Sequence, residues 1–188
     1  EKEIDDKSND VRDLNAQYEQ LTTEYNSARE HLEVMHHTRV GANMTLPGGG
    51  GTGTASSGLN VIAGVIPKDK IEGFERLVYR VTRGNSVCRI DDIDEPFVNP
   101  TTGASTYKNV FALFFGSGLL REKLKKICDA CGANVHPHCS SAADGQTLRE
   151  QVQEQLDHLF SARTQNTVQR RKILSSVAQY VNAWRTFV

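Results

Sequence analysis

The amino-terminal part of the chain carries a long heptad repeat. Apolar residues recur there at alternating spacings of three and four, which is the a and d pattern of a coiled-coil seam. The positions are Ile4, Val11, Leu14, Tyr18, Leu21, Tyr25, Ala28, Leu32 and Met35. The pattern predicts a first shaft helix over residues 1–40, and its narrow apolar stripe requires a partner helix.

The carboxyl-terminal part repeats this pattern and predicts a second shaft helix over residues 145–188. Its apolar positions are Val152, Leu156, Leu159, Ile173, Val177, Tyr180, Trp184 and Phe187. Polar side chains interrupt the seam at Arg163, Asn166 and Arg170. A polar residue at a seam position specifies a partner or a register at some cost in stability.

The two predicted helices complement each other in charge. Residues 1–35 hold ten Asp and Glu against four Lys and Arg, and residues 148–188 hold six Lys and Arg against three Asp and Glu. Since both helices flank one intervening segment, we expect them to pair as an antiparallel two-helix coiled coil. The alternative is two surface helices packed on a core, and the narrow, sustained seam disfavours it.

Residues 59–140 alternate short, branched apolar runs with amphipathic segments. Strands are predicted at 59–66, 86–93, 107–115 and 134–138, and helices begin at Pro67 and after Gly116. The order βαββαβ is that of a ferredoxin-like lobe, in which two helices cover a four-stranded antiparallel sheet. The predicted fold class is therefore α+β, a ferredoxin-like lobe carried on an antiparallel two-helix coiled coil.

Residues 41–58 are rich in Gly and Ser and predict a flexible loop between the first helix and the lobe. The segment lacks the Gly-Lys-Ser/Thr ending with which a phosphate-binding loop reaches phosphate and magnesium. We therefore expect no nucleotide site here, and no other cofactor is expected.

Composition narrows the classes of function. The chain has 188 residues, a net charge of -1 and an isoelectric point near 6.7, which gives no electrostatic basis for binding nucleic acid. It contains no run of eighteen apolar residues and no export leader. We expect a soluble fragment of a longer protein, with its four cysteines kept as thiols in a reducing compartment.

The stretch CDACGANVHPHC concentrates potential metal ligands, namely Cys128, Cys131, His136, His138 and Cys139. A structural zinc site normally takes its second pair of ligands from a separate segment, yet only four residues separate Cys131 from His136. We favour a helix whose two cysteines pack as small apolar residues, followed by a strand. Zinc binding by these five residues is the alternative.

No catalytic set is evident in the sequence. Asp91, Asp92, Asp94 and Glu95 cluster at the end of a predicted strand, without a nucleophile beside them, and are typical of a solvated turn. We therefore expect a non-catalytic chain.

Seven short motifs carry a resemblance to a known family. In chain order they are AGVI (63–66), FER (74–76), Arg80, RGN (83–85), VFALFF (110–115), KKIC (125–128) and the final NAWRTFV. In order and spacing they resemble the cytosolic amino-terminal domain of subunit a of the vacuolar-type proton-translocating ATPase. The glycine-rich insertion and the histidine-cysteine ending of the last predicted strand depart from the family pattern.

The resemblance implies a distal lobe with its two flanking shaft helices, forming part of a stator. In that family this region links the membrane-embedded proton channel, elsewhere in subunit a, to the peripheral-stalk and head-side subunits E, G and C. It would support ATP-driven proton transport, organelle acidification and regulated assembly. The implied location is the cytosolic face of acidic organelle membranes, such as those of the vacuole, endosome, lysosome or Golgi.

Two further expectations concern other partners. The family is associated with phosphoinositide head groups, and two short basic clusters are candidates for contact with them: Arg121, Lys123, Lys125 and Lys126, and Arg170, Arg171 and Lys172. Such clusters are usually solvated faces. The rival to the stator interpretation is a self-associating coiled-coil scaffold, in which the heptads pair between chains.

Overall fold

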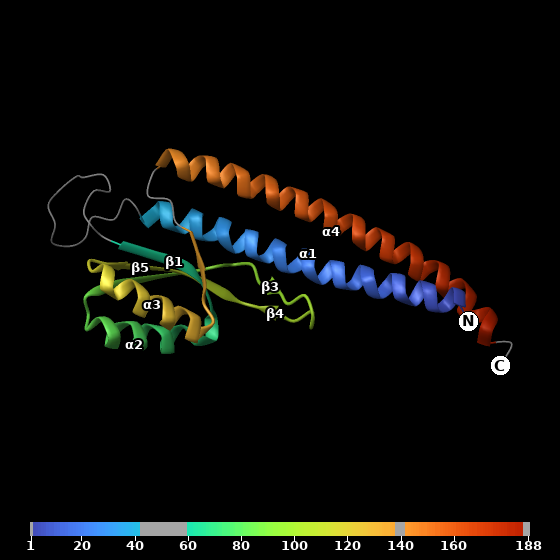
Figure 1. The fold of residues 1–188 in the computed structure, drawn as a ribbon, viewed down its shortest axis with the longest axis horizontal. Coiled ribbons are helices and arrows are strands. Elements are labelled where there is room, and N and C mark those ends of the chain that lie inside the picture. The colour runs from blue at the N-terminus through green and yellow to red at the C-terminus, as the bar shows by residue number, and fades with distance from the viewer. Residues whose placement is uncertain (1, 42–59, 138–141, 186–188) are drawn as a thin grey trace.

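The computed structural model describes residues 2–41, 60–137 and 142–185, with side chains described over 6–38, 60–137 and 145–178 (Figure 1). Most of the predicted loop, together with His138 and Cys139, lies outside these residues. The elements, in chain order, are α1 (Lys2–Gly41), β1 (Asn60–Pro67), a 3-10 turn (Lys68–Lys70), α2 (Ile71–Thr82), β2 (Ser86–Asp92), β3 (Phe97–Val98), β4 (Ser105–Thr106), β5 (Lys108–Phe115), α3 (Gly118–Cys131), β6 (Asn134–His136) and α4 (Ala142–Arg185).

The helices α1 and α4 lie side by side and run in opposite directions (Figure 1). Near both ends, side-chain contacts join residues of the two helices that are far apart in sequence. Near one end Lys7 Nζ donates to Ser176 Oγ at 3.5 Å, and near the other the Arg149 guanidinium donates to the Met35 carbonyl at 3.4 Å. No described helix is both long enough and apolar enough to cross a bilayer.

The contact between α1 and α4 combines an apolar centre with polar residues that pack on aromatic rings. Its apolar centre consists of Ala28, Leu156 and Leu159, with Leu21, Tyr25 and Leu32 packed against them. The guanidinium of Arg163 lies 4.6 Å from the Tyr25 ring centroid, and that of Arg170 lies 4.9 Å from the ring centroid of Tyr18. Buried Asn166 donates to a carbonyl of α1 at 3.2 Å. The predicted interruptions are thus accommodated inside the contact, by cation–π packing and a hydrogen bond.

The four-stranded sheet has the order β2-β5-β1-β6, and every neighbouring pair is antiparallel. Helices α2 and α3 cover one face, while α1 lies along the other (Figure 1). The core under α2 and α3 consists of Ile62, Ile66, Phe74, Val78, Phe111, Leu113, Phe115, Leu124, Cys128 and Ala133. The predicted mixture of helix and sheet is confirmed.

Helix α1 has a second buried face that the heptad pattern does not predict. Val34 packs against the sheet with Ala63, Val65, Val110, Ile93 and Phe97. Val34 is only 1% exposed although it falls outside the predicted seam. The first helix therefore serves two partners, α4 on one side and the sheet on the other.

The structure moves two predicted boundaries. The helix expected to begin at Pro67 begins at Ile71, after a 3-10 turn, and the strand predicted over 134–138 is described for 134–136. Between β2 and β5 the chain also forms a short β3–β4 hairpin, which was not among the predicted strands. Helix α3 ends at Cys131 and is capped by Gly132, which adopts the left-handed conformation with φ of 66°.

Candidate functional site

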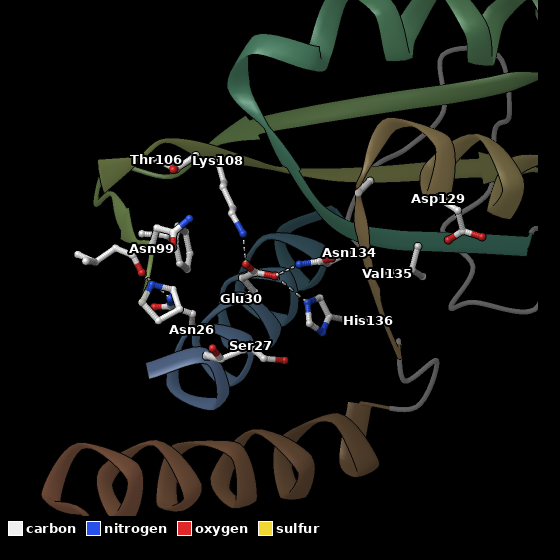
Figure 2. A pocket seen from close by; sticks show the side chains of 15 residues that line it. Asn26, Ser27, Glu30, Asn99, Thr106, Lys108, Asp129, Asn134, Val135 and His136 are labelled. Carbon is white, nitrogen blue, oxygen red and sulfur yellow. Dashed lines mark hydrogen bonds and ion pairs between the residues drawn. The ribbon is translucent and has the colours of Figure 1, made fainter. Parts of the chain in front are cut away.

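A buried carboxylate joins α1 to the sheet. Glu30 is 2% exposed and receives three side-chain contacts (Figure 2). Lys108 Nζ forms an ion pair with Oε1, while Asn134 Nδ2 donates to Oε2 at 2.8 Å and His136 Nε2 lies 3.4 Å from Oε2. A buried carboxylate is tolerable only when it is paired and hydrogen-bonded in this way. We call these four residues the Glu30 cluster.

Strand register places the partners of Glu30 on one side of the sheet. His136 lies opposite Ala63, and Asn134 lies opposite Val65. Because directly opposed residues share a face, both side chains point to the face where Ala63 and Val65 pack under α1. Lys108 reaches the same side from β5, where it is paired with Pro67.

The environment of Glu30 favours its charged form. Burial alone would raise the pKa of this carboxyl, but hydrogen bonds from His136, Lys108 and Asn134, together with the Lys108 charge, hold the pKa below its ordinary value of 4.5. Beside it, His31 stacks on His136 with ring centroids 5.3 Å apart. Burial and the nearby His136 lower the pKa of His31, while a hydrogen bond to the Pro137 carbonyl opposes the shift.

The lowered pKa of Glu30 predicts a loss of stability in acid. In the unfolded chain the Glu30 carboxylate takes up a proton near pH 4.5, and in the folded chain it does so only at lower pH. The contribution of Glu30 to folding stability is therefore complete above pH 4.5 and disappears as pH falls through the folded pKa. Urea unfolding of the native chain and of Glu30→Gln should therefore differ most near neutrality and converge below pH 4.5. Glu19→Gln, exposed on the same helix, serves as control. A difference that stays constant down to pH 3 would contradict the assignment.

A cavity of about 870 Å³ opens beside the Glu30 cluster. Its walls come from α1, the β3–β4 hairpin and β6, and Figure 2 shows Asn26, Asn99 and Lys108 around it. Phe97 forms an apolar part of the wall, with the Arg29 guanidinium 4.6 Å and Lys108 Nζ 5.2 Å from its ring centroid. Since three donors already engage the Glu30 carboxylate, its arrangement suits a structural anchor better than a general base.

The hairpin is tied to α1 beside this cavity. Asn26 Nδ2 donates to the Val98 carbonyl at 2.8 Å. The Arg29 guanidinium forms an ion pair with Glu95 at 2.8 Å and donates to the Pro96 carbonyl at 3.3 Å. Together with the Glu30 cluster, these contacts hold one turn of α1 to three separate segments of the lobe.

The structure separates the described residues of the zinc cluster that the sequence left as the alternative. Cys128 is fully buried on the face of α3 that packs into the core, with Cys131 packed against that core. His136 points to the opposite face of the sheet, toward Glu30. Burial, with Asp129 and Cys131 as smaller contributors, raises the pKa of the Cys128 thiol to about 12, which disfavours the thiolate that a metal requires. His138 and Cys139 lie outside the described residues.

The acidic residues predicted as a solvated turn are largely paired. The Arg89 guanidinium lies 2.9 Å from Asp91, and Asn109 donates to Asp92. Glu95 engages Arg29, as described above. Asp92, Asp94 and Glu95 nevertheless remain exposed, whereas Asp91 is half-buried and pairs with Arg89 on the same strand.

The two basic clusters lie far apart. Arg121, Lys123, Lys125 and Lys126 are exposed on α3, beneath the sheet, while Arg171 and Lys172 are exposed on α4, beyond α1 (Figure 1). Arg170 packs over Tyr18 rather than extending into solvent. The clusters therefore form two small patches on opposite sides of the molecule.

Comparison with known proteins identifies the family. The profile of the V-type ATPase 116kDa subunit family matches residues 1–188, which is the whole chain. The chain belongs to this family. Among curated relatives, the human V-type proton ATPase 116 kDa subunit a 4 is 35% identical over 126 residues, covering 67% of this chain and 15% of that protein. The V-type proton ATPase subunit a1 of Arabidopsis thaliana is 36% identical over 132 residues, covering 70% of this chain and 16% of the relative.

A solved structure is also similar, at 10% identity and a TM-score of 0.40, covering 93% of this chain and 56% of the other. It is the cytoplasmic N-terminal domain of subunit I, a homologue of subunit a of V-ATPase. The family match confirms the resemblance to subunit a drawn from the sequence motifs. The chain spans about 15% of the length of the curated relatives it matches.

The Glu30 cluster was not predicted from the sequence. Its members are separated by 78, 104 and 106 residues along the chain. Glu30 stands in an acidic helix, where a carboxylate is ordinarily a solvated side chain. The one local hint was Val34, one helical turn later, an apolar residue that the heptad seam leaves unused.

Proposed function

We propose that this chain is the distal, non-catalytic stator segment of V-ATPase subunit a. The observation that carries the proposal is the family match over all 188 residues. The chain so matched is built as two long antiparallel helices joined to a lobe. At 1.5 Å per residue the 40-residue α1 extends about 60 Å. Such a paired rod suits the transmission of load between a membrane sector and a catalytic head.

The proposal assigns a role to each part of the chain. Residues 1–40 and 145–188 are the shaft helices, 41–58 the flexible loop and 59–140 the distal lobe. A ferredoxin-like lobe is supported by the strand order β2-β5-β1-β6 and by two helices on one face. A coiled-coil shaft is supported by the heptad repeats and by the buried contact of α1 with α4.

Rigid attachment of the lobe to the shaft supports the mechanical role. Load on the lobe must reach α1 through contacts that do not slide. The buried carboxylate of Glu30 and the Arg29–Glu95 ion pair lie on adjacent residues of α1 and bind three separate lobe segments. These polar contacts supplement the apolar packing around Val34.

In this proposal the lobe binds the peripheral-stalk and head-side subunits E, G and C, and the rest of subunit a supplies the proton channel. The location is the cytosolic face of acidic organelle membranes. The rival, a scaffold that self-associates through its heptads, is less favoured because α1 finds its partner in α4 of the same chain.

The proposal is tested by binding of the 188-residue chain to an isolated heterodimer of subunits E and G, with and without the head-side partner, measured by calorimetry. We expect a Kd of about micromolar or tighter, with the head-side partner strengthening the binding. A folded chain that binds none of these subunits and remains dimeric on dilution would favour the scaffold instead.

A matched pair of leucine variants tests whether the lobe provides the contact. Leu119 on α3 is 85% exposed and Leu174 on α4 is 50% exposed, so Ser at either position should leave the fold intact. If the stalks dock on the side of the lobe that α3 covers, Leu119→Ser weakens binding and Leu174→Ser does not. The reverse result would place the contact on the shaft.

A further inference from the structure

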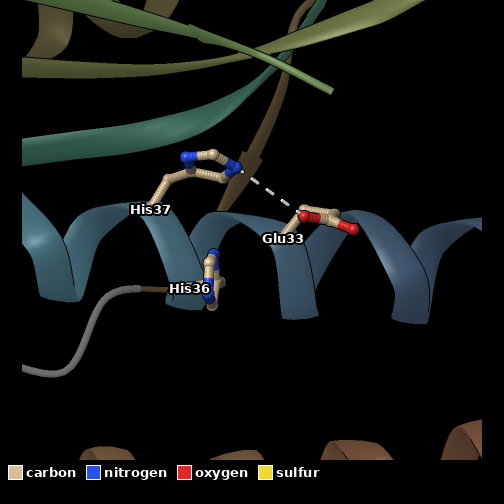
Figure 3. A group of neighbouring side chains, drawn as sticks. All are labelled: Glu33, His36 and His37. Atoms are coloured by element: carbon tan, nitrogen blue, oxygen red, sulfur yellow. Dashed lines mark ion pairs between the residues drawn. The ribbon is translucent and has the colours of Figure 1, made fainter. Parts of the chain in front are cut away.

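A second cluster of side chains lies on α1, one turn beyond Glu30. Glu33, His36 and His37 each offer a potential ligand atom, and these atoms all lie within 4.8 Å of one another (Figure 3). Glu33 and His37 are half-buried and His36 is exposed. The spacings of three and four residues place both imidazoles within reach of the carboxylate on a single helical turn.

The two nitrogens of His37 both face carboxylates. Nε2 lies 3.8 Å from a Glu33 oxygen, and Nδ1 lies 3.7 Å from an oxygen of Asp91 on β2. A neutral imidazole has one N–H and can therefore donate to only one of them. The other nitrogen keeps its lone pair, which is available to bind a metal ion lying between it and the facing carboxylate.

The distances at Glu33 and His37 fit a shared metal ion after a small closure. Zinc binds imidazole nitrogen and carboxylate oxygen at about 2.0–2.2 Å, which places two ligands of a tetrahedral ion roughly 3.4 Å apart. The observed separation of 3.8 Å is close to that distance. Rotation of the exposed His36 ring would bring the third ligand into place.

Asp91 supplies the outer contact that such a site requires. A histidine that binds metal through one nitrogen commonly donates its other N–H to a carboxylate, which sets the tautomer and ring orientation. Asp91 stands at that position beside Nδ1 of His37. Asp91 is itself held by Arg89, whose Nε lies 2.9 Å from its carboxylate.

We propose that Glu33, His36 and His37 bind a divalent transition metal ion of the Zn²⁺ class, with Asp91 positioning His37. Two imidazoles and one carboxylate favour such a metal over Ca²⁺ or Mg²⁺, which prefer oxygen ligands. Water fills the fourth position. Through His37 and Asp91 the ion ties α1 to β2, one of the two edge strands of the four-stranded sheet. This site is independent of the stator role.

The test is calorimetric titration of the 188-residue chain with Zn²⁺ at neutral pH. We expect one ion per chain, and at least tenfold weaker binding in each of Glu33→Gln, His36→Asn and His37→Asn. Asp91→Asn keeps all three ligands and should weaken binding by about tenfold. His158→Asn, an exposed histidine on α4, should change nothing. Circular dichroism checks that each variant is folded. Because His36 is exposed, His36→Asn should preserve the fold.

Co²⁺ distinguishes this site from the cysteine-containing cluster. Thiolate ligands give Co²⁺ an intense near-ultraviolet charge-transfer band because they donate electron density readily, whereas imidazole and carboxylate do not. We expect weak visible bands only, retained in the double variant His138→Asn/Cys139→Ser. The proposal is overturned by a thiolate band that this double variant abolishes, by binding that survives His36→Asn and His37→Asn, or by no binding at millimolar Zn²⁺.

Discussion

Replacing Glu30 with alanine is expected to lower the free energy of unfolding by about 3–5 kcal/mol, the usual cost of removing one partner from a buried ion pair. The Glu30 side chain is 3% exposed and that of Lys108 is 21% exposed, so the ammonium loses its counter-charge where little water can replace it. Asn134 and His136 lose their acceptor in the same substitution. Urea unfolding followed by circular dichroism measures the effect.

Glu19→Ala is the matched control for this experiment. Glu19 is exposed on α1, and its truncation should change stability by less than about 0.5 kcal/mol. A cost below about 1 kcal/mol for Glu30→Ala would show that the cluster does not anchor the lobe. It would also remove the main polar support for rigid attachment of the lobe to the shaft.

Gly64→Ala is the second substitution with a large expected effect, a loss of about 3 kcal/mol or more. A Cβ at Gly64 would lie 2.2 Å from the Asn134 carbonyl oxygen and 3.0 Å from a ring carbon of Phe111. The carbonyl belongs to the backbone of β6 and cannot rotate away as a side chain would. Strand β6 must therefore separate from β1, taking Asn134 and His136 away from Glu30.

Hydrogen exchange locates the damage from Gly64→Ala. Amides of β6 should lose protection, while the pairing of β2 with β5 should retain it, because the backbone atoms nearest to the new methyl group belong to Asn134 of β6. Gly73→Ala on α2 is the matched control: its Cβ would have no neighbour within 4 Å, and alanine should stabilise the helix by about 0.5–1 kcal/mol. Unchanged stability in Gly64→Ala would show that β1 and β6 are less closely apposed than described.

The predicted helices and strands largely match the observed ones because their signals are local. The strands predicted at 59–66, 86–93 and 107–115 are observed at Asn60–Pro67, Ser86–Asp92 and Lys108–Phe115. Branched apolar runs bounded by Gly, Pro and Asn report burial on the scale of a single strand. One boundary shifted where a 3-10 turn replaced the expected start of a helix, and the β3–β4 hairpin formed where no regular element was expected.

The candidate sites depended on contacts that such patterns do not contain. The stretch CDACGANVHPHC contains five potential ligands that are close together in the sequence. In the fold, however, Cys128 lies on one side of the sheet and His136 lies on the other. Conversely, Glu30 finds Lys108, Asn134 and His136 only because strand register aligns β5 and β6 under one turn of α1. No local pattern in the sequence indicates that alignment.

By itself the sequence determined the two long amphipathic helices, the βαββαβ order between them and the motifs that place the chain in its family, because repeating burial follows backbone geometry over a few residues. Only the tertiary structure decided that α1 also covers the sheet, through Val34 and Glu30. The same packing decided that His37 meets Asp91. The physical reason is that burial and charge pairing depend on which faces meet, and those faces belong to segments far apart in the chain.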